Sequence, residues 1–199
     1  IIADYTSREE NCCLGVHTVV GSTAAIIRGV GGPNAMPTVA DPFARQAYAN
    51  RSTESDIKDK GISGEVNWET NWLGGATLTS ITSSRDWQTI NGLDFDYTGA
   101  DLLYRNADED ESLTKFETFT QEFRLTGSTE SIDWMVGMFY ADEDLTRNDS
   151  YRVGAGYEPY LSTLILANIN PLLATSPTAP LFLSQATGRP FGTGFVGLG

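Results

Sequence analysis

Two runs of residues near the middle of the chain alternate between apolar and polar side chains. They cover residues 119–126 and 132–141, and the small polar segment 127–130 lies between them. Because successive side chains of a strand point to opposite faces, each run predicts a β-strand with one apolar face. The apolar positions are Phe119, Phe123 and Leu125 in the first run and Ile132, Trp134, Val136, Met138 and Tyr140 in the second. With its short polar connection, segment 119–144 predicts a β-hairpin.

A second hairpin is predicted before the first. Its opening strand has one apolar face, made of Ile62, Val66 and Trp68. Residues 71–75 contain two glycines and predict a turn. Residues 76–88 follow and are rich in Thr and Ile, which are common in strands.

The hairpins divide the chain into three regions. Residues 59–144 contain the strands, and the acidic, turn-rich segment 89–115 connects the two hairpins. Residues 1–58 and 145–199 show little periodicity and predict long loop regions. Short turns therefore alternate with long connections along the chain.

Short elements are predicted within the loop regions. An Asp-Pro pair at the start of residues 41–50 favours a short helix there. Residues 160–173 are apolar and predict a helix that ends at a proline. Residues 16–20 and 24–30 fit either short strands or turns of helix.

The charge of the chain excludes some classes of function. The sequence has 26 acidic and 13 basic residues, a formal net charge of −13. Nucleic-acid binding requires clustered Lys and Arg, and docking on anionic lipid requires a polybasic patch. The acidic balance therefore argues against both kinds of binding. No run reaches the roughly 18 consecutive apolar residues of a membrane-spanning helix.

Two all-β folds fit this pattern. Strands of about ten residues with an apolar face, a polar opposite face and aromatic residues near their ends are typical of a transmembrane β-barrel. The aromatic residues in such positions are Trp68, Trp72, Trp87, Trp134 and Tyr140. Short turns at one end and long loops at the other also fit a barrel, whose periplasmic turns are short. The alternative is a soluble antiparallel β-sandwich, whose strands alternate in the same way.

Several segments resemble the barrel of TonB-dependent outer-membrane receptors, in particular the group found in sphingomonad-like and caulobacter-like bacteria. They are GISGEVNWET, ATLTSITSSRDW, DFDYTGADLL, FTQEFRLTG and IDWMVGMFYADEDL, in this order. The resemblance covers residues 59–144. It implies an antiparallel transmembrane β-barrel fragment with short periplasmic turns and long extracellular loops.

The same resemblance implies a function, a location and partners. Receptors of this family have a 22-strand barrel and an N-terminal plug that contacts a TonB-type energy-coupling protein, and this sequence has no segment resembling the plug. The chain is accordingly expected to be part of a receptor in the bacterial outer membrane, surrounded by lipid. Such a receptor takes up a scarce small-molecule ligand such as a siderophore, a cobalamin or a saccharide. The alternative function is a soluble or surface-attached β module that binds or assembles with partners and transports nothing.

The first residues match this expectation of a longer protein. Residues 1–13 have neither a basic start nor a long apolar core, so they do not predict a signal peptide, and no initiating Met is present. We therefore expect the natural N-terminus to lie upstream.

Charged residues on the polar strand faces are candidate lumen-facing residues. They are Glu65, Glu69, Glu122 and Arg124. Charges are costly on the lipid face of a barrel, which favours an inward orientation. There they would pair with one another, satisfy polar groups in the barrel interior or line a passage.

The acidic segment is a candidate calcium site. Calcium takes about six to eight oxygen ligands. The candidate ligands are Asp94, Asp96, Asp101, Asp108 and Asp110, with Glu109 and Glu111 in the same cluster. Because the spacing lacks the EF-hand framework, a solvated, self-repelling surface loop is the alternative.

No catalytic constellation is present in the sequence. His17 is the single histidine, and no Ser or Cys lies in a nucleophile-elbow motif. Cys12 and Cys13 are adjacent, which is too few ligands for zinc and leaves a strained local disulfide or two loop thiols as alternatives. The sequence therefore predicts no enzyme and no metal centre or cofactor other than calcium.

Overall fold

The computed structural model describes residues 1–71 and 74–197, and the chain forms two compact units. The first, here called the sheet unit, comprises Ile1–Glu10, Ser55–Ile90 and Ser112–Asp149. The second, the loop unit, comprises Asn11–Glu54, Asn91–Glu111 and Ser150–Gly199. Trp72, one of the aromatic residues singled out in the sequence, lies outside the described residues.

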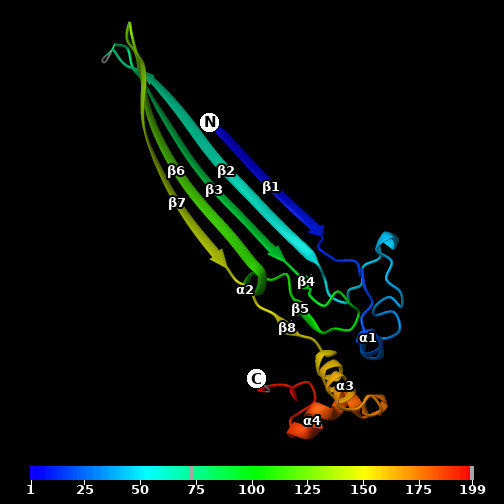
Figure 1. Ribbon diagram of the computed structural model, residues 1–199. Helices are drawn as coiled ribbons and strands as arrows, with labels where there is room; N and C mark the ends of the chain where they lie inside the picture. Colours follow the sequence, from blue (N-terminus) through cyan, green and yellow to red (C-terminus); the bar gives the residue numbers. More distant parts are fainter. Residues whose placement is uncertain (72–73, 198–199) are drawn as a thin grey trace. The chain divides into compact units, whose positions relative to one another are not determined.

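The sheet unit is built on one five-stranded sheet of long strands (Figure 1). Its order is β1-β2-β3-β6-β7. The strands are β1 (Ile2–Asn11), β2 (Glu54–Glu69), β3 (Thr77–Asn91), β6 (Leu113–Ser128) and β7 (Asp133–Arg147). β6 pairs antiparallel with β3 on one side and with β7 on the other. Both predicted hairpins are therefore strand pairs of this sheet, and no barrel is closed among the described residues.

The sheet is larger than the sequence pattern predicts. Residues 2–11, expected to be loop, form β1, and β2 begins at Glu54 rather than near Gly61. The reason is that nine of the ten β1 residues are exposed, so neither of its faces needs to be apolar. This strand forms because its backbone pairs with β2. Backbone pairing alone does not require alternating apolar residues, so the sequence shows no such pattern here.

The loop unit combines short helices with a small sheet. Its three-stranded sheet has the order β4-β5-β8, with β4 (Leu93–Asp94), β5 (Leu103–Arg105) and β8 (Arg152–Val153). Its main helices are α1 (Ala24–Gly31), α3 (Tyr157–Ile169) and α4 (Phe182–Thr187), and its 3₁₀ turns are η1 (Pro42–Ala44), η2 (Leu173–Thr175) and η3 (Ala179–Leu181). The four-residue helix α2 (Glu109–Ser112) lies where the two units meet in sequence. Within the described part of the chain, none of the helices is long and apolar enough to cross a membrane.

The loop unit contains both predicted helices, with different bounds, and a disulfide between the two adjacent cysteines. The Asp-Pro pair does start a helix, because an Asp41 side-chain oxygen accepts hydrogen bonds from the Phe43 and Ala44 backbone N–H groups. That helix is three residues long and ends at Arg45, in the left-handed region with φ 52°. The predicted helix over 160–173 is α3, which starts three residues earlier. Cys12 and Cys13 form the vicinal disulfide, with Cα atoms 3.7 Å apart.

A buried carboxylate holds the C-terminal part of the loop unit together. Glu158, on α3, is 1% exposed. One of its oxygens accepts a hydrogen bond from the Ser184 backbone N–H at 3.1 Å, and the other accepts one from Gly194 at 2.9 Å. Ser162, one turn further along α3, accepts a hydrogen bond from the Leu183 N–H. Polar side chains of α3 thus satisfy backbone donors of the chain that returns over it.

Replacing the buried glutamate should loosen this segment. Glu158→Ala leaves two buried N–H groups without acceptors, and we expect a loss of about 2–4 kcal/mol of local stability. Hydrogen exchange of the Ser184 and Gly194 amides measures it directly and should become faster. Gln185→Ala, at an exposed position of α4, is the matched control and should leave both amides unchanged. Equal exchange in both variants would show that the carboxylate does not hold the segment.

Candidate functional site

The register of the sheet brings the predicted apolar faces onto one side. Phe123 lies opposite Met138, and Leu125 lies between Leu78 and Val136 in the two pairings of β6. Residues directly opposite each other in an antiparallel pair share a face of the sheet. The apolar faces predicted for the two arms of the 119–144 hairpin therefore coincide.

The first hairpin contributes to the same face. Lys60 of β2 pairs with Asp86 of β3, whereas Asn67 accepts a hydrogen bond from Thr79. Because Asp86 and Thr79 lie on opposite faces of β3, even-numbered residues of β2 share the face of Asp86. The resulting surface, here called the apolar band, consists of Ile62, Val66, Trp68, Leu78, Phe119, Phe123, Leu125, Trp134, Val136, Met138 and Tyr140.

Most of the apolar band is exposed within the described chain. Val136 is 67% exposed, Met138 63% and Trp68 60%. Soluble proteins rarely leave a contiguous surface of large apolar residues uncovered. The band is therefore expected to contact something other than water.

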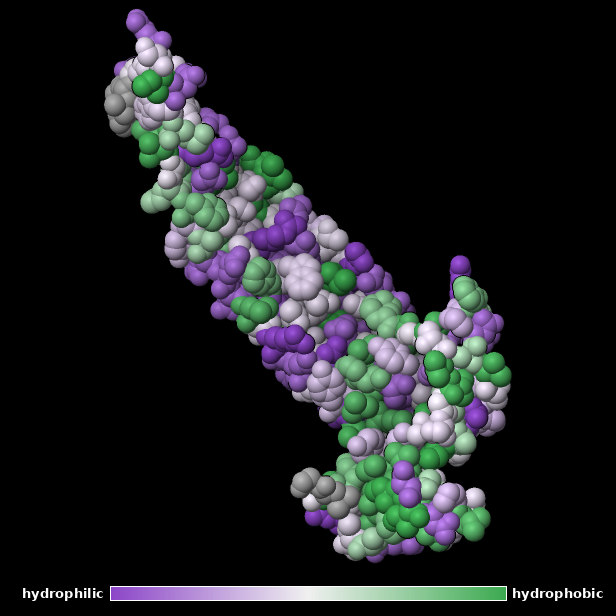
Figure 2. Space-filling model, in the orientation of Figure 1, coloured by the Kyte–Doolittle hydropathy of each residue, from purple (hydrophilic) through white to green (hydrophobic). Residues whose placement is uncertain are grey.

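The band ends where charged rows begin on the same face. Phe119 is opposite Asp142, and two residues nearer the start of β6, Glu117 lies between Asp86 and Asp144. Lys115 pairs with Glu117 at 2.9 Å and with Asp86 at 3.7 Å. Figure 2 shows hydrophilic and hydrophobic residues side by side along this unit. The apolar rows thus lie toward the short turns and the charged rows toward the long connections.

The height of the band can be estimated from strand geometry. It extends over seven residues of β6, from Phe119 to Leu125, which is about 23 Å at roughly 3.3 Å per residue. With strands tilted by about 40°, the band would be about 18 Å tall, compared with the roughly 25 Å apolar belt of outer-membrane barrels.

The four predicted lumen-facing residues share the face opposite the band. Arg124 and Glu122 pair with each other at 2.6 Å. Glu65 accepts a hydrogen bond from Asn67 at 2.7 Å, and Glu69 is exposed two residues beyond Asn67. Their common face follows from the register, and a role in a lumen stays a prediction.

This opposite face is not uniformly polar. Met135 and Phe139 of β7 lie on it and are 64% and 65% exposed. Trp87 also lies on it, opposite Phe116, so this tryptophan does not belong to the aromatic girdle expected on the apolar side. Trp134 stays on the band face, opposite Gly127. A Cβ at Gly127 would lie 2.3 Å from the Trp134 ring, so a side chain at this position would require the ring to move.

The acidic segment forms a network of anchors in the loop unit. Asp94 is fully buried, and its carboxylate accepts hydrogen bonds from the backbone N–H groups of Asn50, Arg51 and Tyr97. Asp96 closes the following loop by accepting from the Leu102 and Leu103 N–H groups at 3.0 Å. These two aspartates hold a turn-rich segment in one conformation by satisfying its backbone donors.

Asp101 forms an ion pair with Arg51 in this network. Its two oxygens accept hydrogen bonds from Nε of Arg51 at 2.7 Å and from a terminal guanidinium nitrogen of Arg51 at 2.9 Å, and one of them also accepts from the Ala155 N–H. The Arg51 guanidinium lies 3.8 Å from the Tyr104 ring centroid. The hydrogen bonds with Arg51 lower the pKa of Asp101, whereas burial raises the pKa of Asp94.

Of the last acidic residues in this segment, Glu111 is buried and Asp108 and Asp110 are exposed. Glu111 is 7% exposed, pairs with Arg152 and accepts hydrogen bonds from Asn106, and the pairing with Arg152 lowers its pKa. Asp108 and Asp110 are exposed, and Asp108 accepts a hydrogen bond from the Asp110 N–H. The expectation of a solvated loop therefore holds for Asp108 and Asp110 and is wrong for Asp94 and Glu111.

The candidate calcium ligands are not gathered in one place. Among the described residues no three His, Cys, Asp or Glu side chains form a group suited to a metal ion. The oxygens of Asp94, Asp96 and Asp101 are directed at backbone donors and at Arg51. Calcium binding by this segment stays a prediction.

Comparisons with known proteins add no family to this picture. No family model, no curated protein and no solved structure matches the chain.

The partners of the acidic residues in these ion pairs cannot be predicted from the sequence. Arg51 and Asp101 are 50 residues apart, and Arg152 and Glu111 are 41 apart. No local pattern links residues at such distances. A surplus of acidic residues near a few arginines was the only available signal.

The Arg51–Asp101 pair should make stability depend on pH. Since the pKa of Asp101 is lower in the folded state, its contribution is present above the unfolded value near 3.9 and is lost as the pH falls through the folded value. Arg51→Gln should lower the free energy of unfolding by about 1–2 kcal/mol at pH 7 and by less at pH 3. Urea unfolding followed by circular dichroism measures both, with Arg189→Gln as the control. A deficit that is the same at both pH values would contradict the assignment.

Proposed function

We propose that this chain is part of a TonB-dependent outer-membrane receptor that takes up a scarce small-molecule ligand by energy-coupled transport. The observation that carries the proposal is the apolar band, which occupies one face of long antiparallel strands and gives way to charged rows on that same face. The resemblance of residues 59–144 to such receptors supplies the family. In this proposal the band faces lipid, the short turns are periplasmic and the long connections are extracellular.

The polar face and the open edges support the same proposal. Glu65, Glu122 and Arg124 lie opposite the band, where a barrel has its interior. The two edge strands of the sheet, β1 and β7, have neighbours on one side only among the described residues. Lipid does not tolerate unpaired edges, so a barrel requires further strands beside both. In this proposal a TonB-type energy-coupling protein would act through a plug, which no segment of this sequence resembles.

A soluble β module is the second candidate. A sandwich would cover the apolar band with a second sheet at about 10 Å. The sheet unit contains one sheet, and the band remains exposed within it. The observation that favours a module is the presence of exposed Met135 and Phe139 on the opposite face, which a partner protein would cover.

The first test is the behaviour of the intact polypeptide in native membranes. A receptor would be several times heavier than the 21.6 kDa of this chain and would be released only by detergent. A polypeptide of about this mass that is recovered without detergent would overturn the proposal and leave the binding module.

A matched pair of substitutions tests which face meets lipid. Met138 and Met135 lie on the same strand and are equally exposed, but only Met138 is in the apolar band. Arginine on the lipid face costs about 2–4 kcal/mol near the bilayer midplane. In the full-length receptor, Met138→Arg should therefore reduce folding into phosphatidylcholine vesicles by at least tenfold, whereas Met135→Arg should change it less than threefold. Equal losses in both variants, or none, would contradict a lipid-facing band.

A further inference from the structure

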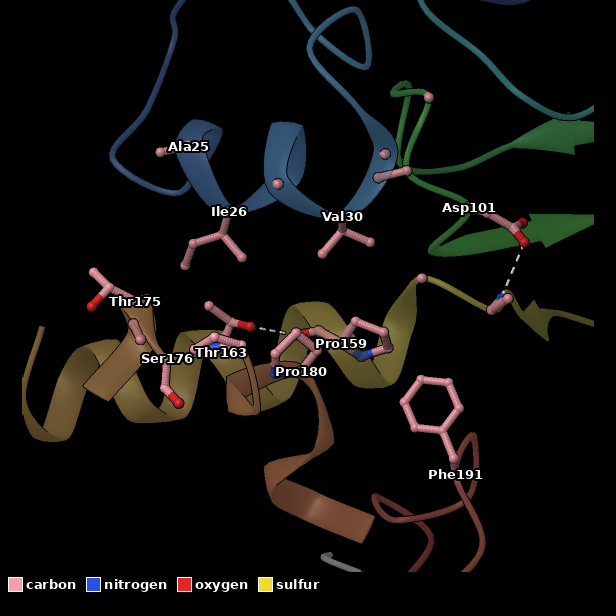
Figure 3. A pocket seen from close by; sticks show the side chains of 18 residues that line it. Ala25, Ile26, Val30, Asp101, Pro159, Thr163, Thr175, Ser176, Pro180 and Phe191 are labelled. Carbon is pink, nitrogen blue, oxygen red and sulfur yellow. Dashed lines mark hydrogen bonds between the residues drawn. The ribbon is translucent and has the colours of Figure 1, made fainter. Parts of the chain in front are cut away.

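The loop unit contains a pocket of about 840 Å³ that lies apart from the carboxylate network except at Asp101. Helix α1 forms one wall with Ile26 and Val30, and α3 forms the facing wall with Pro159 and Thr163 (Figure 3). Phe191, from the C-terminal segment, closes one end. Its volume lies within the roughly 300–1,000 Å³ typical of small-molecule sites.

The space exists because small residues line it. Gly29, Gly99 and Ala100 belong to the lining, and so do Ala25, Ala155, Gly156 and Ala174. A Cβ at Gly29 would meet no atom within 4 Å. Larger side chains at these positions would fill the pocket. Figure 2 shows hydrophobic residues gathered where α3 and α4 lie.

The chemistry of the lining selects against charged ligands. Among the described residues, no Lys, Arg or His lines the pocket, so no cationic side chain in this lining neutralises an anion. Asp101, the one acidic residue in the described part of the lining, is already held by Arg51 and by the Ala155 N–H. A cation would therefore find no free carboxylate in the lining.

Two threonine hydroxyls in the lining keep hydrogen-bond acceptors. Thr163 donates its proton to the Pro159 carbonyl at 2.8 Å, and Thr175 donates to the Leu172 carbonyl at 2.8 Å. Each hydroxyl oxygen keeps lone pairs that can accept a hydrogen bond. A ligand with an N–H or O–H donor on an apolar body complements this arrangement.

We infer that this pocket binds an uncharged, largely apolar small molecule that carries a hydrogen-bond donor. Its body packs between Ile26 and Val30 of α1 and Pro159 of α3, its end meets the Phe191 ring, and its donor is directed at Thr163 or Thr175. This site lies within the loop unit, and its occupation does not depend on transport or on a membrane location.

Two fluorescent probes that differ by one charge test the chemistry. N-Phenyl-1-naphthylamine is uncharged and has one N–H donor, and 8-anilino-1-naphthalenesulfonate has the same ring system with a sulfonate. Titration of the whole chain should show the uncharged probe binding at least tenfold more tightly at this site. Binding of the anionic probe as tight as that of the uncharged one would overturn the inference.

A pair of glycine substitutions separates the pocket from other apolar surfaces, including the apolar band. Gly29→Leu should fill the pocket and abolish the site-specific binding, and it should not unfold α1, because leucine favours helix over glycine. Gly21→Leu also introduces a side chain with no neighbour within 4 Å of its Cβ, but outside the pocket, and should bind like the unsubstituted chain. Retained binding in Gly29→Leu, or equal loss in both variants, would overturn the inference.

Discussion

The antiparallel register of β6 with β3 and β7 is the constraint on which the proposed function depends. Because the side-chain period of a strand is two, a shift of one residue would move Phe123 and Leu125 away from Met138 and Val136. The register keeps eleven apolar side chains on one face and places Glu122 and Arg124 on the other. The two faces therefore differ in composition, although exposed Met135 and Phe139 also lie on the second one.

The loop unit is stabilised in a different way. Few large apolar side chains are buried in it, and buried carboxylates replace them as organising elements. Asp94, Asp96 and Glu158 each accept hydrogen bonds from at least two backbone N–H groups. Long connections lack the regular backbone hydrogen bonds of strands and helices. Side-chain carboxylates therefore accept hydrogen bonds from their backbone N–H groups instead.

The sequence predicted those features that depend on local periodicity. The faces containing Phe123 and Met138, and the helix started by Asp41, follow from patterns a few residues long. β1 was missed because its residues are exposed on both faces, so pairing alone determines it. Asp94 was singled out as a possible metal ligand, and the sequence offered no sign that Asn50 and Arg51 would donate to it. The pocket was not predictable either, since α1, α3 and Phe191 are far apart in the sequence.

The order of segments along the chain has a consequence for how the protein acquires its structure. The loop unit is made of three stretches, and stretches of the sheet unit lie between them in sequence. Bringing Arg51 to Asp101 closes a loop of 50 residues that contains both β2 and β3. The entropy cost of that closure falls once these two strands pair, because the hairpin shortens the free chain between the two residues. Hairpin formation should therefore precede the carboxylate anchors, and the pocket should be among the last features to form.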